Sequence, residues 1–276
     1  MGNRKIKISE KRLFKLYWVE NKSSFKIARI YGCESQTIRN RIKEFKIKKK
    51  TKCQAHVRYP RYDFAGDRVE KAYLIGFRIG DLRVYKTKPY SETIIAQCHT
   101  TCNNQVVLFK KVFKKYGQVT VTNLKDRSFD INCYLNNTFN FLLPKEDKIE
   151  PWICRNKKCF TGFIAGYTDA EGNFIINQKK ARFKIDSYDR LVLEGIHLWL
   201  LRNKINSKLR LIGKKGQLRP EGYVFNNDLW RLNVNEAHSL LRFIDIIRPF
   251  VKHRKRMKDM NFCAVNILKR KKLGTI

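Results

Sequence analysis

The sequence predicts an α+β protein, in which a small all-α domain precedes two related units with the element order αββαββα. Two observations lead to this fold. A short motif of apolar residues, glycine and an acid occurs twice, and each copy is followed by the same succession of strand-like and helix-like segments. Residues 1–50 differ from the rest, because their apolar residues recur only at helical spacing.

Residues 1–50 are predicted to form three short helices. Apolar residues recur with helical periodicity from Glu10 to Trp18, and the pair Ser23-Ser24 can cap a second helix. Gly32 follows that helix, where a tight turn needs a positive φ angle. Ser35 is the predicted cap of the third helix.

The segment from Ser24 to Phe45 resembles a helix-turn-helix. Ala28 is small where the two helices would cross, and Ile38 would pack the second helix onto the first. Lys and Arg far outnumber acidic residues in this region. The alternative is a three-helix unit that merely has a basic surface. If the unit binds DNA, the side chains on the exposed face of the third helix would enter the major groove: Gln36, Thr37, Arg39, Asn40 and Lys43.

Residues 51–71 have the composition of a basic linker, and the two units are predicted at 72–150 and 151–276. In the first unit we expect strands at 82–88, 92–101, 118–122 and 129–135, with a helix at 106–116. In the second we expect strands at 173–179, 181–187, 208–212 and 229–234, and helices at 191–203, 236–247 and from 252 onward.

The repeated motif predicts that two helices pack closely. It reads AYLIGFRIGD from Ala72 to Asp81 and GFIAGYTDAE from Gly162 to Glu171. When the copies are aligned on Gly76 and Gly166, each has small residues four positions apart, which share one helix face. Such a face lets two helix backbones approach each other, so that Asp81 and Glu171 would end the two helices side by side.

Two carboxylates at close range repel each other unless a divalent cation lies between them. Oxygen ligands favour Mg²⁺, or Mn²⁺ in its place, and such an ion can activate water for phosphodiester hydrolysis. Asp81 and Glu171 are therefore the predicted metal ligands and catalytic acids. The alternative is a pair of ordinary core helices with acids at their exposed ends. The repetition of the motif in one register argues against that alternative.

The composition restricts the partners of the protein. A formal net charge of +36 favours a polyanion, with nucleic acid ahead of an anionic membrane surface. No apolar run is long enough to span a membrane, and the N-terminus lacks the apolar segment of a secretory signal. We therefore expect an intracellular protein whose eight cysteines are reduced thiols rather than zinc ligands. Walker, Rossmann and HExxH motifs do not occur.

The repeated motif and its acids resemble those of single-chain, two-repeat LAGLIDADG homing endonucleases, over roughly residues 72–270. The second copy is similar throughout, with Asp169 at the other acidic position of the motif. The first copy has Ile79 at that position, Leu82 in place of the final glycine, and an unusual Arg78. The acid that binds metal in the family is present in both copies.

The resemblance implies a saddle of two antiparallel sheets that lies in the major groove of DNA. Alternate residues of the first hairpin of each unit would read bases, although a one-residue slip in register would invert the face. The candidate base-reading residues are Arg83, Tyr85, Lys88 and Gln97 in the first unit and Asn173, Ile175, Asn177, Lys179, Arg182 and Lys184 in the second. The resemblance also implies one basic residue beside each scissile phosphate, for which the candidates are Lys145 and Lys252.

The resemblance implies a monomeric, site-specific endonuclease that cuts double-stranded DNA at a long asymmetric site. It would hydrolyse one phosphodiester on each strand across the minor groove, leave short 3′ overhangs, and promote mobility of a host intron or intein. Two alternatives use the same fold: a DNA-binding transcription regulator that does not cleave, and an RNA maturase. The presence of an acid in both motif copies favours cleavage.

Overall fold

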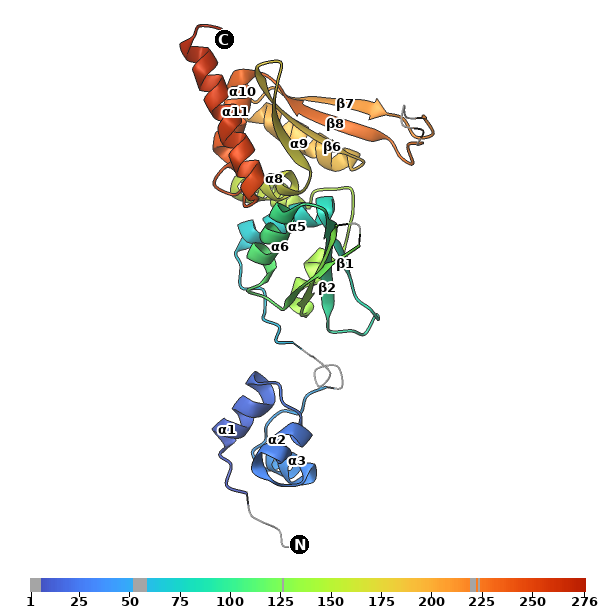
Figure 1. Ribbon diagram of the computed structural model, residues 1–276, viewed down its shortest axis with the longest axis vertical. Coiled ribbons are helices and arrows are strands. Elements are labelled where there is room, and N and C mark those ends of the chain that lie inside the picture. Colours follow the sequence, from blue (N-terminus) through green and yellow to red (C-terminus); the bar gives the residue numbers. More distant parts are fainter. Residues whose placement is uncertain (1–5, 52–58, 126, 219–221, 223) are drawn as a thin grey trace.

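The computed structural model describes residues 6–51, 59–125, 127–218, 222 and 224–276. A small helical unit at the N-terminus is followed by two α+β units that lie one after the other along the long axis of the molecule (Figure 1). Each of these two units contains a four-stranded antiparallel sheet. The predicted fold class is therefore confirmed for the two repeated units.

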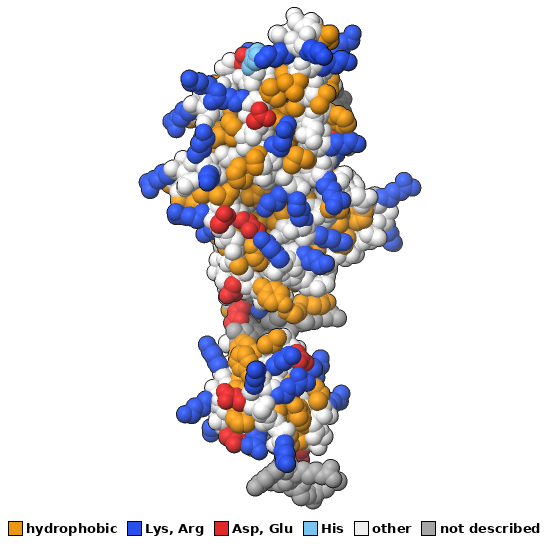
Figure 2. All heavy atoms as spheres, turned by 90° about the vertical axis from the view of Figure 1, so that its left-hand side faces the viewer, with side chains coloured by type: hydrophobic (Ala, Val, Ile, Leu, Met, Phe, Trp, Pro, Cys, Tyr) orange, Lys and Arg blue, Asp and Glu red, His pale blue; other side chains and the backbone are white. Residues whose placement is uncertain are grey.

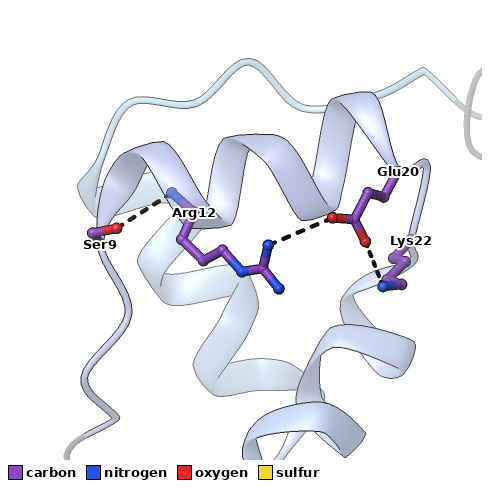
Figure 3. A network of polar contacts seen from close by, with 4 residues as sticks. All are labelled: Ser9, Arg12, Glu20 and Lys22. Atoms are coloured by element: carbon purple, nitrogen blue, oxygen red, sulfur yellow. Dashed lines mark hydrogen bonds and ion pairs between the residues drawn. The ribbon is translucent and has the colours of Figure 1, made fainter.

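The N-terminal unit contains helices α1 (Glu10–Phe14), α2 (Ser24–Tyr31) and α3 (Ser35–Glu44), and α1 continues into a π-helical turn at Lys15–Val19. Its small core is formed by the fully buried side chains of Leu13, Leu16, Ile27 and Ile38, together with Ala28 and Ile42. Glu20 forms ion pairs with Arg12 at 3.6 Å and Lys22 at 2.5 Å, which fasten the end of the first helix to the start of α2 (Figure 3).

The predicted cap of α3 is wrong by one residue. Gly32 ends α2 with a φ of +61°, as expected, and the N–H of Cys33 donates back to the carbonyl of Ala28. This tight turn leaves Glu34 as the extended residue before the helix, so Glu34 takes the cap position. Ser35 is instead the first helical residue, and its hydroxyl accepts a hydrogen bond from the Arg39 guanidinium.

The two repeated units have corresponding elements. The first comprises α5 (Arg68–Asp81), β1 (Arg83–Tyr85), β2 (Ile94–Thr100), α6 (Asn103–Phe113), β3 (Val119–Asn123), β4 (Phe129–Leu135) and the 3₁₀ helix η2 (Asn137–Leu142). The second comprises α7 (Pro151–Cys154), α8 (Lys157–Glu171), β5 (Gly172–Asn177), β6 (Lys180–Ser187), α9 (Arg190–Arg202), β7 (Lys208–Gly213), β8 (Leu229–Val234), α10 (Ala237–Ile247) and α11 (Arg254–Lys272). The sheet orders β1-β2-β4-β3 and β5-β6-β8-β7 are equivalent.

Two of the expected base-reading residues lie outside the strands. β1 ends at Tyr85, and Lys88 belongs to the turn before β2, where its carbonyl accepts from the N–H of Ser91. The pairing of Asn177 with Lys180 leaves a two-residue turn between β5 and β6, and Lys179 occupies it with a positive φ. Two-residue turns of this kind match the twist of the strands they join. The strand predicted at 173–179 therefore ends two residues early, at Asn177.

The second half of the predicted linker belongs to the first α+β unit. Helix α5 begins at Arg68, and the residues before it are held against the unit. The Arg61 guanidinium donates to the Thr93 hydroxyl at 2.6 Å, and the Phe64 ring packs against Phe139. Aromatic burial therefore orders this segment in spite of its basic composition. Residues 52–58 of the linker lie outside the described part of the chain.

In each unit the helices cover one face of the sheet and leave the other face open. Alternate strand residues such as Phe174 and Phe183 are buried, and the Phe183 ring lies 4.8 Å from that of Phe243 on α10. Helices α6, α10 and α11 lie on the same side of the molecule, and the sheets extend to the other side (Figure 1). No helix within the described ranges is long and apolar enough to cross a membrane.

The positive charge is not confined to one side of the protein. Figure 2 shows the side on which α6 and α11 lie, where Lys and Arg side chains are spread over the whole surface and acidic side chains are few. Helix α11 itself ends in a run of four basic residues, from Lys269 to Lys272. The net charge alone therefore does not identify a DNA-binding surface, and the residues on the open face of each sheet decide whether that face suits DNA.

Candidate active site and nucleic-acid interface

The two motif helices, α5 and α8, pack directly against each other through their glycines. A Cβ atom built on Gly76 would lie 2.1 Å from the carbonyl oxygen of Phe163, and one built on Gly166 would lie 2.0 Å from that of Tyr73. These neighbours are backbone atoms, which cannot give way without moving a helix. The close approach that the spacing of small residues predicts is thus confirmed.

This packing brings the two acids together at the ends of the helices. A Cβ on Gly80, the residue before Asp81, would lie 3.2 Å from the Cγ of Glu171. Burial by surrounding protein atoms, followed by repulsion from Glu171, raises the pKa of Asp81 to about 7. Burial, followed by the charge of Asp189, also raises the pKa of Glu171. As whole residues, Asp81 is exposed and Glu171 is partly exposed, so the end of the two helices borders on solvent.

The two acids have different neighbours. Gln105, a buried residue in the first turn of α6, donates from Nε2 to the Oδ2 of Asp81 at 2.5 Å. In the second unit, the residue near Glu171 is Asp189, which accepts hydrogen bonds from the Tyr167 hydroxyl and the Ser187 hydroxyl at 3.0 Å each. An amide therefore supports one acid, and a second carboxylate lies near the other. The sequence carried no signal for Gln105, because only the tertiary fold brings α6 to the motif.

Two positive charges act on the paired acids. Lys145 and Arg256 each lower the pKa of both Asp81 and Glu171, although burial outweighs them. Lys145 follows η2 and is exposed. Arg256 lies in the first turn of α11 and was not predicted. Its Nε is buried without a hydrogen-bond partner.

Lys252 has different surroundings from those expected. Its Nζ lies 4.0 Å from the centre of the Tyr73 ring, and burial lowers its pKa. The cause is the capture of its backbone N–H by Asp169, at 2.7 Å, which fixes this residue just before α11. The position one helical turn further on, Arg256, is the one whose charge reaches the paired acids.

The acid pair fits a hard divalent cation. Asp81 and Glu171 provide oxygen ligands. Burial, followed by a neighbouring carboxylate, raises the pKa of each acid, so a cation beside the pair would favour their charged forms. Among the described residues, no group of three or more His, Cys, Asp or Glu could hold a metal. The remaining ligands of an octahedral Mg²⁺ would then be water, main-chain carbonyl or phosphate oxygens, which is usual for this ion at phosphate sites.

The strand register decides which residues of the two sheets face outward. Because Val84 and Ala96 are buried, their strand neighbours Arg83, Tyr85 and Gln97 share the open face of the first sheet. In the second sheet, the open face carries five of the predicted residues, Asp186, and four basic or amide residues that were not predicted. The predicted ones are Asn173, Ile175, Asn177, Arg182 and Lys184. The additional ones are Lys208, Arg210, Arg231 and Asn233.

The two open faces differ in charge. In the second sheet, Arg231 forms two hydrogen bonds with Asp186 at 2.5 and 2.6 Å, and Lys184 approaches the same carboxylate at 3.5 Å. In the first sheet, Gln97 and Asn132 donate amide hydrogens to Asp130 at 2.9 and 2.8 Å. The first face therefore presents a carboxylate held by two amides, whereas the second presents several cations around one carboxylate.

The fold and the acid pair define a protein of two αββαββα units that join at their motif helices. Residues 159–248, which make up most of the second unit, match the LAGLIDADG-like domain family. The first unit has the same order of strands in its sheet. No curated protein sequence matches the chain.

Among solved structures, the chain is similar to I-DmoI in complex with DNA and Ca, with 15% identity, a TM-score of 0.49, and coverage of 71% of this chain and 98% of that chain. It is also similar to I-DmoI in complex with DNA and Mn, with 18% identity, a TM-score of 0.45, and coverage of 67% and 98%. Full-length DUF199/WhiA from Thermatoga maritima has 16% identity, a TM-score of 0.48, and coverage of 76% and 63%. The fold assignment rests on the family match and on the element order.

Proposed function

We propose that this protein is a site-specific, divalent-metal-dependent endonuclease for double-stranded DNA. The observation that carries the proposal is the meeting of Asp81 and Glu171 at the ends of two packed helices, between two sheets with open polar faces. One chain supplies both halves of the site, which supports a monomer and a target without palindromic symmetry. Cleavage would promote the mobility of the intron or intein that encodes the chain.

In this proposal, Asp81 and Glu171 hold Mg²⁺ or Mn²⁺. When bound, the ion supplies Lewis acidity for attack of water on the scissile phosphodiester. Gln105 is a positioning residue, because its hydrogen bond to Oδ2 fixes the Asp81 carboxylate and leaves Oδ1 available. Lys145 and Arg256 would balance the charge that develops on the phosphate in the transition state.

The open sheet faces would bind the major groove on either side of the cleavage point. Arginine and lysine recognise guanine edges, and asparagine and glutamine recognise adenine edges. The second sheet, with Arg182, Lys208 and Arg210, would then favour guanine-rich sequence. The first sheet, with Gln97 and Asn132, would read its half of the site with amides.

The proposal is tested by cleavage of a randomised duplex library with Mg²⁺. We expect the wild-type protein to cut one long sequence, and Asp81→Asn and Glu171→Gln to bind that sequence without cutting it. The matched controls are Asp245→Asn, at an exposed position of α10, and Glu194→Gln, at a partly exposed position of α9 where the carboxylate pairs with Arg190. Both controls should cut like the wild type.

Other outcomes would favour the alternatives. A protein that binds one duplex sequence but never cuts it with Mg²⁺ or Mn²⁺ would be a non-cleaving regulator. A protein that prefers a structured RNA to every duplex would be a maturase. In both cases the acid pair would have no part in hydrolysis, and Asp81→Asn would leave the measured activity unchanged.

A further inference from the structure

The segment that leads from the N-terminal unit into the first α+β unit is anchored at one end of the first sheet. The Arg61 guanidinium donates to the carbonyl of Glu92 at 2.9 Å and to the Thr93 hydroxyl at 2.6 Å, just before β2 begins. The opposite end of β2 leads into α6, where Gln105 contacts Asp81. The anchor therefore lies at the end of the sheet that is distant from the acid pair.

The last described residue of the N-terminal unit contacts the same end of the sheet. The Thr51 hydroxyl donates to the Glu92 carboxylate at 3.3 Å. The tail before it is held on the helical unit, because the Trp18 indole donates to the carbonyl of Lys48 at 3.0 Å and the Lys50 N–H donates to the Tyr17 hydroxyl. The eight peptide units from Thr51 to Tyr59 span at most about 28 Å, so the N-terminal unit remains near this end.

Helix α3 exposes a face with the chemistry of a DNA-reading helix. Ile38 and Ile42 are buried against α2, whereas Gln36, Arg39 and Asn40 are exposed. The Gln36 amide donates to the Asn40 side-chain oxygen at 2.9 Å, so two amides are presented together on one turn. Amides and a guanidinium at the start of such a helix match adenine and guanine edges in the major groove.

The open face of the first sheet has fewer cations for binding DNA than that of the second, and α3 can supply additional contacts. Arg83 is the cation that β1 brings to the open face of the first sheet, and there it lies 4.8 Å from the Tyr85 ring. The open face of the second sheet presents several cations, including Arg182, Lys208 and Arg210. Since phosphate contacts supply much of the affinity for DNA, the first half-site is the weaker one by this measure.

We propose that α3 binds the major groove of the duplex immediately beyond the half-site of the first sheet, so that the target extends on that side only. The bound partner is duplex DNA, read by Gln36, Arg39, Asn40 and Lys43, with Thr37 at the edge of the face. This inference deepens the proposed function, because the orientation of the target is defined by the two sheets.

Hydroxyl-radical footprinting on the selected duplex tests the inference. The Asp81→Asn, Glu171→Gln double variant serves as the uncut background, and the test variant adds Arg39→Ala and Asn40→Ala. The matched control is Arg41→Gln, which removes a charge from the same helix where the guanidinium is paired with Glu44 at 2.7 Å. An Arg182→Ala variant identifies the half-site that the second sheet binds, because this variant should protect the DNA of that half-site less.

We expect the test variant to lose protection on the flank opposite the Arg182 mark, to keep the core footprint, and to bind 10- to 100-fold more weakly. The control should give the wild-type footprint. A test variant whose footprint equals that of the background protein would overturn the inference, and so would loss of protection on the flank next to the Arg182 mark. Circular dichroism of both variants verifies that the helices are intact.

The same variants with both acids restored separate this inference from the proposed function. Arg39→Ala with Asn40→Ala should cut the core at the wild-type rate once the duplex is saturated with protein. If the wild type never cuts but still loses one flank on substitution, the endonuclease proposal fails and this inference stands. If the wild type cuts but protects no flanking DNA that depends on Arg39 and Asn40, only this inference fails.

Discussion

The Tyr73 hydroxyl donates a 2.6 Å hydrogen bond to the Oδ2 of Asp169, from one motif helix to the other. The same oxygen accepts the backbone N–H groups of Lys252 and His253, at 2.7 and 3.2 Å. One buried carboxylate thus joins α5, α8 and the start of α11. This structural role accounts for an acid at this position of the second motif that is not part of the paired acid site.

The first motif uses a different side chain for the same kind of connection. Ile79 replaces the acid and is buried, whereas Arg78 donates from Nε to the carbonyl of Leu142 at 2.8 Å and from Nη1 to the carbonyl of Leu82. In the first motif, a buried guanidinium binds one carbonyl at the end of η2 and one just after α5. In the second motif, a carboxylate binds N–H groups before α11. The departure of the first motif is therefore compatible with close packing of the helices.

Removing the hydroxyl of Tyr73 should destabilise the two joined units. Tyr73→Phe keeps the ring but leaves a buried carboxylate with one donor fewer, which costs about 1–3 kcal/mol. Urea denaturation followed by circular dichroism measures the loss. Tyr62→Phe, at a ring that is 60% exposed, is the control and should change the stability little. Equal stability of the two variants would argue against the role assigned to Asp169.

Alanine at the helix crossing should be more damaging than alanine elsewhere. In Gly76→Ala or Gly166→Ala the new methyl group would meet a backbone oxygen of the other helix, with an expected cost of about 3 kcal/mol or more. Gly195→Ala on α9 is the control, because its Cβ would approach only the flexible end of the Ile149 side chain, at 2.9 Å. Thermal unfolding compares the three, and a tolerated Gly166→Ala would contradict the packing.

Stability without divalent ions should fall as the pH rises towards 8. The folded pKa of Asp81, about 7, lies above its ordinary value of 3.8, so its favourable contribution is complete below pH 3.8 and is lost as the pH rises through 7. Asp81→Asn should therefore stabilise the metal-free protein at pH 8, by about 1 kcal/mol after allowance for solvent screening. The gain should shrink towards pH 4. Urea titrations across this range measure it, and a pH-independent gain would contradict the assignment.

Divalent ions should relieve the same repulsion. At pH 8 we expect Mg²⁺ to raise the melting temperature of the wild type and excess EDTA to reverse the effect, with about 2.7 kcal/mol of stabilisation at a hundred times the Kd. The Asp81→Asn, Glu171→Gln double variant should not respond. An equal response of that variant would place the binding ions elsewhere on the protein.

Arg256 and Lys252 should differ in their effect on cleavage. We expect Arg256→Gln and Lys145→Gln each to slow single-turnover cutting by about 10- to 100-fold, because each removes a charge that acts on the paired acids. Lys252→Gln should slow it less, since the Lys252 ammonium lies on the Tyr73 ring. Binding measured in parallel separates affinity from rate. A larger defect in Lys252→Gln than in Arg256→Gln would instead support Lys252 as the basic residue beside the scissile phosphate.

The sequence by itself determined the two repeats, the order of their elements and the pairing of Asp81 with Glu171. These features are local in origin: hydrophobic periodicity sets helix or strand, and small residues four apart mark a helix face that packs closely. The turn at Gly32 could also be predicted from the sequence, because few residues other than glycine adopt its positive φ. The ends of β1 and β5 could not be predicted as well, since turn geometry and strand pairing limit the length of each strand.

Only the tertiary structure decided which other groups reach the paired acids and which face of each sheet is open. Gln105, Arg256 and Arg231 come from elements that are distant in sequence from the motifs, and no local pattern distinguishes them among the other polar residues of a chain with 60 Lys and Arg. Lys252 shows the reason most directly. Its position in the sequence suggests a phosphate contact, whereas in the structure Asp169 of α8 accepts its backbone N–H and its Nζ lies over the Tyr73 ring. The charge of Arg256, one helical turn further on, lowers the pKa of both acids.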